Sequence, residues 1–187
     1  MIDEQQNMLF KGKVARVVSS VDPILLTQLI FSGWLKKINN EEMLALFSVL
    51  IDQVKAGKEH QVLVSRISDN FWNACMFLEE ECDKLIATEA KFGVADQLKD
   101  KGKRLNYYFY EIVYDWVKKK SFLQIKREHP ALEEGITIKC ILSVGQLCKT
   151  VKEMSNLIGD VALAQRMDDA AELLQREIMS TQSLYFQ

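Results

Sequence analysis

The sequence predicts an all-α fold: a helical bundle with long antiparallel helices and a short extended segment near the start of the chain. Two observations support this class. Apolar residues recur at alternating steps of three and four along most of the 187 residues, which is the period of an amphipathic helix. An Asp or Asn precedes most of these runs and a Gly follows them, as at helix ends. The extended exception is KVARVVSS, residues 13–20.

The composition is that of one globular domain. Hydrophobic residues make up 48% of the chain and charged residues 27%, enough to form and solubilise a buried core. The formal net charge of −2 creates no overall basic field, so any nucleic-acid contact must come from a local surface. Charged residues interrupt every apolar run before the roughly 18 residues that a membrane span requires. The start, MIDEQQNMLFKGK, lacks a signal-peptide apolar region. We therefore expect an intracellular protein without membrane contact.

Two short helices are expected in the first third of the chain. Asp22 is a suitable N-cap, a proline occupies the first helical position after it, and Gly33 ends the helix. The second helix follows the cap Asn40, carries two glutamates in its positive first turn and ends at Gly57.

A long amphipathic helix is expected from about residue 60 to residue 91, with Gly93 beyond its end. Its apolar face consists of Val64, Ile67, Phe71, Cys75, Leu78, Cys82 and Leu85. The stretch KDKGKR, residues 99–104, is typical of an exposed turn. All four cysteines, at positions 75, 82, 140 and 148, lie in helical stretches at spacings of seven and eight. Seven helical residues span about 10 Å, too far for shared metal ligation, so we expect reduced cysteines in the core.

The next expected helix, residues 105–120, is apolar on most sides and should lie inside the domain. One face carries Leu105, Phe109, Ile112, Val113 and Trp116, and another carries Tyr107, Tyr110 and Tyr114. The tyrosines suit packing better than base stacking. The closing run Lys118–Lys120 suits the negative end of the helix dipole, with phosphate contact as an alternative.

Two long helices complete the bundle. One runs from about residue 136 to residue 158 and ends at Gly159, and the other begins at the cap Asp160 and continues through Ile178. Their short connection predicts an antiparallel hairpin. The tail residues Leu184, Tyr185 and Phe186 could be the remnant of a cleaved tag, or native residues that pack on the domain.

No catalytic or metal site is predicted. The chain lacks GxxxxGK[ST], GxGxxG and HExxH motifs. The sequence therefore has neither the phosphate-binding loop of an ATPase nor the zinc-binding helix of a zinc protease. Neither histidine, His60 or His129, has a neighbouring nucleophile, and His129 is expected to be exposed in a loop before a proline. Adjacent acidic pairs on helices point to different sides and suit solvated faces.

The helix expected at residues 136–158 has two stripes. The apolar seam is Ile141, Val144, Cys148, Val151 and Ile158; the second stripe, Lys139, Ser143, Gln146, Thr150 and Glu153, is polar but mostly uncharged. Solvated faces usually carry Glu and Lys, so this stripe suits an interface or a channel wall, although an ordinary exposed face remains an alternative. We take Lys139, Ser143, Gln146 and Thr150 as the candidate site.

Five blocks in order carry a family resemblance: KGKVARVVSSVDPILLTQLIFSG, EEMLALFSVLI, YEIVYDWVKKKSFLQI, EEGITIKCI, and QREI with a terminal SLY. This order resembles the C-terminal helical (DSHCT) domain of Ski/Dob-type DExH-box exosome RNA helicases over residues 11–186. The resemblance implies that residues 1–10 are an N-terminal extension, that residues 11–187 are the single helicase C-terminal domain, and that the Ser183–Phe186 tail is native.

In this family, the domain lies on the helicase motor lobes, and the penultimate helix lines the RNA channel as a ratchet. The resemblance implies that Lys139, Ser143, Gln146 and Thr150 line a path for single-stranded RNA. The partners it implies are the motor lobes and exosome cofactor proteins; ATP and Mg²⁺ belong to the motor lobes. The family usually has a second basic residue where Ser143 stands and an acid where Gln146 stands, and this departure weakens the expected RNA grip.

The sequence leaves two functions open. A third, a small independent enzyme, would require a reactive group that the sequence does not show. One is an RNA-channel domain of an ATP-dependent helicase that feeds RNA to the exosome, with motor motifs encoded upstream. The other is a free-standing helical adaptor that binds protein partners without RNA contact. Within the family, the stretch LCKTVKEMSNLIG and the Gln187 ending favour the cytoplasmic superkiller branch over the nuclear branch.

Overall fold

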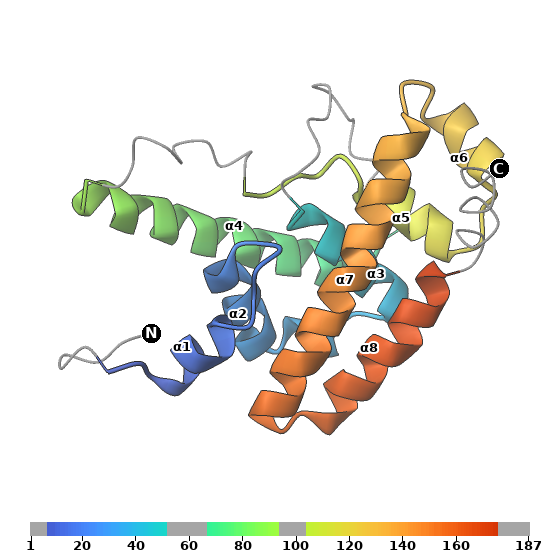
Figure 1. The fold of residues 1–187 in the computed structure, drawn as a ribbon. Helices are drawn as coiled ribbons and strands as arrows, with labels where there is room; N and C mark the ends of the chain where they lie inside the picture. The colour runs from blue at the N-terminus through green and yellow to red at the C-terminus, as the bar shows by residue number, and fades with distance from the viewer. Residues whose placement is uncertain (1–6, 52–66, 94–103, 176–187) are drawn as a thin grey trace, which may run out of the picture.

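In a computed structural model of the chain (Figure 1), the described residues are 7–51, 67–93 and 104–175. Within these ranges the secondary structure is helical, without a β-strand, so the predicted all-α class is confirmed. The elements in order are α1 (Phe10–Ala15), α2 (Pro23–Ser32), the 3₁₀ helix η1 (Trp34–Lys36), α3 (Asn40–Val49), α4 (Asp69–Lys91), α5 (Tyr110–Val117), α6 (Phe122–Glu128), α7 (Glu134–Ile158) and α8 (Val161–Leu174).

Several helix ends are those that the capping residues predict. The Asp22 Oδ1 atom accepts hydrogen bonds from the backbone N–H groups of Ile24, at 2.9 Å, and Leu25, at 3.2 Å, which starts α2. Gly33 ends it in the left-handed conformation with φ of 78°. Gly159 likewise ends α7 with φ of 77°, and the next residue, Asp160, caps α8. The predicted hairpin of α7 and α8 is confirmed, since the two helices lie side by side (Figure 1).

The start of the chain differs from the prediction of an extended segment at residues 13–20. Residues 13–15 belong to α1, and no strand forms within 16–20. Val14, Ala15 and Val18 are buried, and the burial of the adjacent residues 14 and 15 does not fit the two-residue alternation of a strand. Burial of one side against the bundle has overridden the strand preference of β-branched residues.

The second predicted helix begins and ends at other residues than predicted. Its cap is Asn39 rather than Asn40, because Asn39 forms a capping box with Glu42: each side chain accepts a hydrogen bond from the other residue's backbone N–H. The helix ends at Val49, before the predicted end; Gly57 lies outside the described residues. The backbone N–H of Asn106 donates to the Val49 carbonyl at 2.7 Å, so a distant segment satisfies the helix end.

The long helix also begins later than predicted. Ile67 is a bend, Ser68 is the N-cap, and α4 starts at Asp69; residues 60–66 lie outside the described residues. Glu42 accepts a hydrogen bond from the Ser68 backbone N–H at 2.9 Å, which ties the start of α4 to the start of α3. The predicted apolar face is otherwise confirmed, with Phe71, Cys75, Leu78 and Cys82 buried.

The helix predicted at residues 105–120 is shorter than expected, since α5 spans only Tyr110–Val117. Its predicted inner face is nevertheless buried: Leu105, Phe109, Ile112, Val113 and Trp116. The prediction of an exposed turn before it is wrong at Arg104, which is 7% exposed; residues 99–103 of that stretch lie outside the described residues.

Helix α3 lies at the centre of the core. Every residue from Glu42 to Val49 is buried, and α3 contacts α4, α5, α7 and α8.

The prediction of reduced core cysteines is confirmed, because Cys75, Cys82, Cys140 and Cys148 are free and buried. The end of the second long helix, Ile178, and the tail Leu184–Phe186 lie outside the described residues. Helix α7 packs one side against this core and turns its other side outward.

Candidate functional site

The four candidate residues on α7 differ in their access to solvent. Lys139 and Gln146 are exposed, Ser143 is half-buried, and Thr150 is only 8% exposed. The Thr150 hydroxyl donates to the Gln146 carbonyl at 3.3 Å within the helix. Of the four side chains, Thr150 thus has the least capacity to contact a ligand.

Helix α1 and the segment after it lie along α7. Phe10, at the start of α1, lines the same surface groove as Ile158 at the end of α7. Ser20, which follows α1, lines a small cavity with Ser143 and Gln146. The segment from Phe10 to Ser20 therefore runs antiparallel to the second half of α7, which α1 contacts.

The outward face of α7 includes two residues that the sequence analysis did not select. Leu142 is 48% exposed, and Lys149 is exposed between Gln146 and Glu153. Residues 139, 142, 146, 149 and 153 follow one another at steps of three and four, so they share one face. The same periodicity was present in the sequence; only the packing of α1 shows which neighbouring stripe stays open.

Two lysines on this face, Lys139 and Lys149, have no carboxylate partner within the described ranges. By contrast, Lys152 on the α8 side of the same helix pairs with Asp168 at 2.7 Å, and Lys118 pairs with Glu41 at 3.1 Å. Unpaired ammonium groups on an open helix face are suited to contact with an anionic partner.

A small cavity opens between α7 and the segment that joins α1 to α2. Its volume is about 70 Å³, and the described residues that line it are Ser20, Val21, Ile51, Ser143 and Gln146. Two of the four candidate residues therefore meet at one place, with Ser20 opposite them. Sequence reasoning missed Ser20, because nothing in its neighbourhood predicts contact with a helix more than a hundred residues later.

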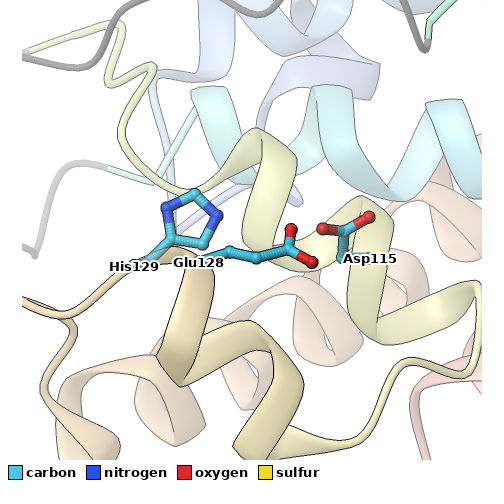
Figure 2. A group of neighbouring side chains, drawn as sticks. All are labelled: Asp115, Glu128 and His129. Carbon is cyan, nitrogen blue, oxygen red and sulfur yellow. The ribbon is translucent and has the colours of Figure 1, made fainter.

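A second group of polar side chains lies at α5 and α6. Ligand atoms of Asp115, Glu128 and His129 lie within 4.8 Å of one another, and Figure 2 shows the Glu128 carboxylate turned toward that of Asp115. The Lys120 ammonium donates to Asp115 at 2.6 Å and to Glu128 at 2.8 and 3.0 Å. This ammonium already binds both carboxylates that a metal ion would need, so the group supports an ion-pair network. His129, expected to be exposed, is half-buried.

The structure also bears on two alternatives from the sequence, base stacking by the tyrosines and phosphate contact by the run Lys118–Lys120. Tyr110 is 3% exposed and packs against Phe71 and Trp72, with ring centroids 5.8 and 5.6 Å apart, so it serves packing rather than base stacking. Burial is the main cause that raises the pKa of the Tyr110 hydroxyl. Lys118 and Lys120 bind carboxylates at the end of α5. No helix among the described residues is long and apolar enough to cross a bilayer.

Comparison with known proteins identifies the family. Residues 5–182 match the DSHCT (NUC185) domain. The chain is 30% identical over 192 aligned residues to "Antiviral helicase SKI2" of Saccharomyces cerevisiae, covering 98% of this chain and 14% of that protein. It is 29% identical over 180 residues to "ATP-dependent RNA helicase mtr4" of Schizosaccharomyces pombe, covering 94% and 15%. It is 26% identical over 186 residues to "Superkiller complex protein 2" of Homo sapiens, covering 100% and 14%.

The chain thus spans about one-seventh of the length of these relatives. The family match covers nearly all of it, including α1 and the α7–α8 hairpin. The chain belongs to the DSHCT domain family of Ski2- and Mtr4-type RNA helicases.

Proposed function

We propose that this chain is the accessory RNA-channel domain of an ATP-dependent, exosome-associated RNA helicase, where it guides single-stranded RNA for 3′–5′ unwinding and degradation. The observation that supports the proposal most directly is the open face of α7. Lys139 and Lys149 stand unpaired on it within the described ranges, and the uncharged Ser143 and Gln146 lie between them. Cations that meet phosphates, together with neutral hydrogen-bonding groups, are what a sequence-tolerant RNA path requires.

The proposal assigns the remaining functions to other partners. ATP and Mg²⁺ would be held by the motor lobes of a full-length helicase, since this sequence has no phosphate-binding loop. The proposed partners are single-stranded RNA, those motor lobes and exosome cofactor proteins, and the proposed location is the cytoplasm. The relatives named as helicases are about seven times longer than this chain, which fits a domain that acts with a motor.

The test is RNA affinity of the chain at two salt concentrations. Lys139→Ala should weaken binding and lower the slope of log K against log salt by about 0.7, the value for one lost phosphate contact on a single strand. Ser143→Arg should strengthen binding, because a guanidinium can stack on a base or bind its edge. Lys152→Ala is the matched control: it removes the same charge from the same helix, but its ammonium is paired with Asp168.

Equal binding by all four proteins, with RNA crosslinks elsewhere in a motor-containing protein, would contradict the channel function. A second candidate function would then be preferred: a free-standing helical adaptor that binds protein partners without RNA contact. The observation that favours it is the exposure of Leu142 and Leu157, at 48% and 51%, on the outer side of α7. Apolar side chains on an open helix face suit a protein surface.

A further inference from the structure

The small cavity between α7 and the α1–α2 connection has a size that limits what can enter it. Its volume of about 70 Å³ corresponds to roughly two water molecules at about 30 Å³ each. A whole nucleobase ring cannot be enclosed in such a space. A hydroxyl group or the edge of a base can reach into it from the open side.

Among the described residues, the polar groups that line the cavity are uncharged. They are the hydroxyls of Ser20 and Ser143 and the amide of Gln146, with Val21 and Ile51 as apolar walls. Among the residues the structure describes, none of these three side chains forms a hydrogen bond within the protein. Hydroxyls and amides can both donate and accept, so they match neutral hydrogen-bonding groups better than phosphate.

Along the axis of α7, the cavity lies between Lys139 and Lys149, which have no carboxylate partner among the described residues. Lys139 and Lys149 are ten residues apart, which is about 15 Å along a helix. Ser143 and Gln146 lie between them in sequence and therefore along the same stretch of helix axis. A strand whose phosphates meet the lysines would pass its neutral groups over the cavity.

We infer that this cavity binds a neutral hydrogen-bonding group of single-stranded RNA, a base edge or a 2′-hydroxyl, and that Ser20 forms its second wall. The inference rests on the proposed RNA-channel function and adds a residue outside α7 to it. It also makes the α1–α2 connection part of the RNA path.

The experiment compares Ser20→Ala with Ser19→Ala in the full chain, using labelled oligo(rU), oligo(rA) and oligo(dU) at two salt concentrations. Both serines are exposed and adjacent, but only Ser20 lines the cavity, so Ser19→Ala is the matched control. Ser20→Ala should raise the dissociation constant about three- to tenfold, the effect of one hydrogen bond. The salt slope should stay unchanged, because no charge is removed.

The oligonucleotides distinguish the two sources of the bound group. A 2′-hydroxyl predicts that Ser20→Ala weakens oligo(rU) and oligo(rA) alike and leaves oligo(dU) unaffected. A base edge predicts equal weakening of oligo(rU) and oligo(dU) and a different effect on oligo(rA). Gln146→Ala should follow the pattern of Ser20→Ala in either case.

The inference is overturned when Ser20→Ala and Ser19→Ala bind every oligonucleotide alike while Lys139→Ala still weakens binding. In that result the RNA-channel function survives and the cavity has no part in it. Absence of any effect of Lys139→Ala, or of RNA binding altogether, instead contradicts the proposed function itself. Unchanged melting temperatures of the serine variants exclude a folding defect as the cause.

Discussion

Arg104 binds Asp22 across 82 residues of sequence: its Nη1 atom donates to the Asp22 Oδ2 atom at 2.7 Å. The Nη2 atom of the same guanidinium donates to both carboxylate oxygens of Glu89, at 2.6 and 2.8 Å. The Arg104 side chain is 6% exposed and the two carboxylate side chains 18% and 19%. One nearly buried cation thus joins the start of α2 to the last turns of α4.

Replacing this cation should destabilise the domain strongly. Arg104→Met keeps much of the side-chain volume but leaves two poorly solvated carboxylates unpaired, and we expect a loss of about 3 kcal/mol in the free energy of unfolding. Urea denaturation measures it. The control is Lys84→Met, which removes an exposed, solvent-screened partner of Glu81 and should leave the free energy of unfolding nearly unchanged. Equal stability of the two variants would show that the buried pair contributes nothing.

Gly145 within α7 should be replaceable with a gain in stability. A Cβ atom there would lie 3.8 Å from the Leu174 Cδ1 atom, which is ordinary contact, and Ala has a helix propensity about 1 kcal/mol better than Gly. We expect Gly145→Ala to raise the free energy of unfolding by about that amount. Gly159→Ala should instead lower it by about 1 kcal/mol, since its φ of 77° strains any L-residue. Thermal unfolding that shifts both variants in the same direction contradicts this account.

Asp160 should contribute stability that depends on pH. The Lys36 ammonium, which lies 2.8 Å from it, and the Leu163 backbone N–H hold the pKa of this carboxyl below its ordinary value of 3.8. The folded state therefore favours the ionised form, so the stabilisation is present above the ordinary pKa and disappears as the pH falls through the lower one.

The variant Asp160→Asn tests this, because Asn preserves the N-cap acceptor and removes only the charge. At pH 7 it should be less stable than the wild-type chain, and the difference should shrink as the pH is lowered from about 5 to 2. Chemical denaturation at several pH values measures the difference. Asp169→Asn, which removes a charge from the exposed side of α8, is the control for net charge. A difference that is constant with pH excludes the proposed role of ionisation.

The cysteines should be unreactive in the folded protein. Burial raises the pKa of the Cys75, Cys140 and Cys148 thiols to about 12, and Cys82 is fully buried. Since the thiolate is the reactive form, a disulfide-exchange reagent at pH 8 should modify the native chain slowly. In denaturant, all four cysteines should react at once. Fast modification of the native chain would show that a helix bearing a cysteine opens readily.

Local sequence determined the helix ends that depend on neighbours in the chain. Asp22 and Gly33 bound α2, and Gly159 with Asp160 separates α7 from α8, because a cap or a left-handed glycine acts within one turn of its own position. The apolar seam of α7 was predictable for the same reason: burial follows the helical period once a helix has formed. The family resemblance, stated for residues 11–186 and confirmed by a family match over residues 5–182, depended on the order of such local segments.

Only the tertiary structure decided the features that join distant segments. Arg104 was expected in an exposed turn but is buried and forms ion pairs with Asp22 and Glu89. Helix α3 ends where the Asn106 backbone N–H donates a hydrogen bond to the Val49 carbonyl. The candidate stripe of α7 was predicted as four residues of one helix face, yet Thr150 is buried while Lys139 remains open. The period of a helix determines which residues share a face, but whether that face meets water depends on what packs against it, and α1, which contacts α7, lies more than a hundred residues earlier in the chain.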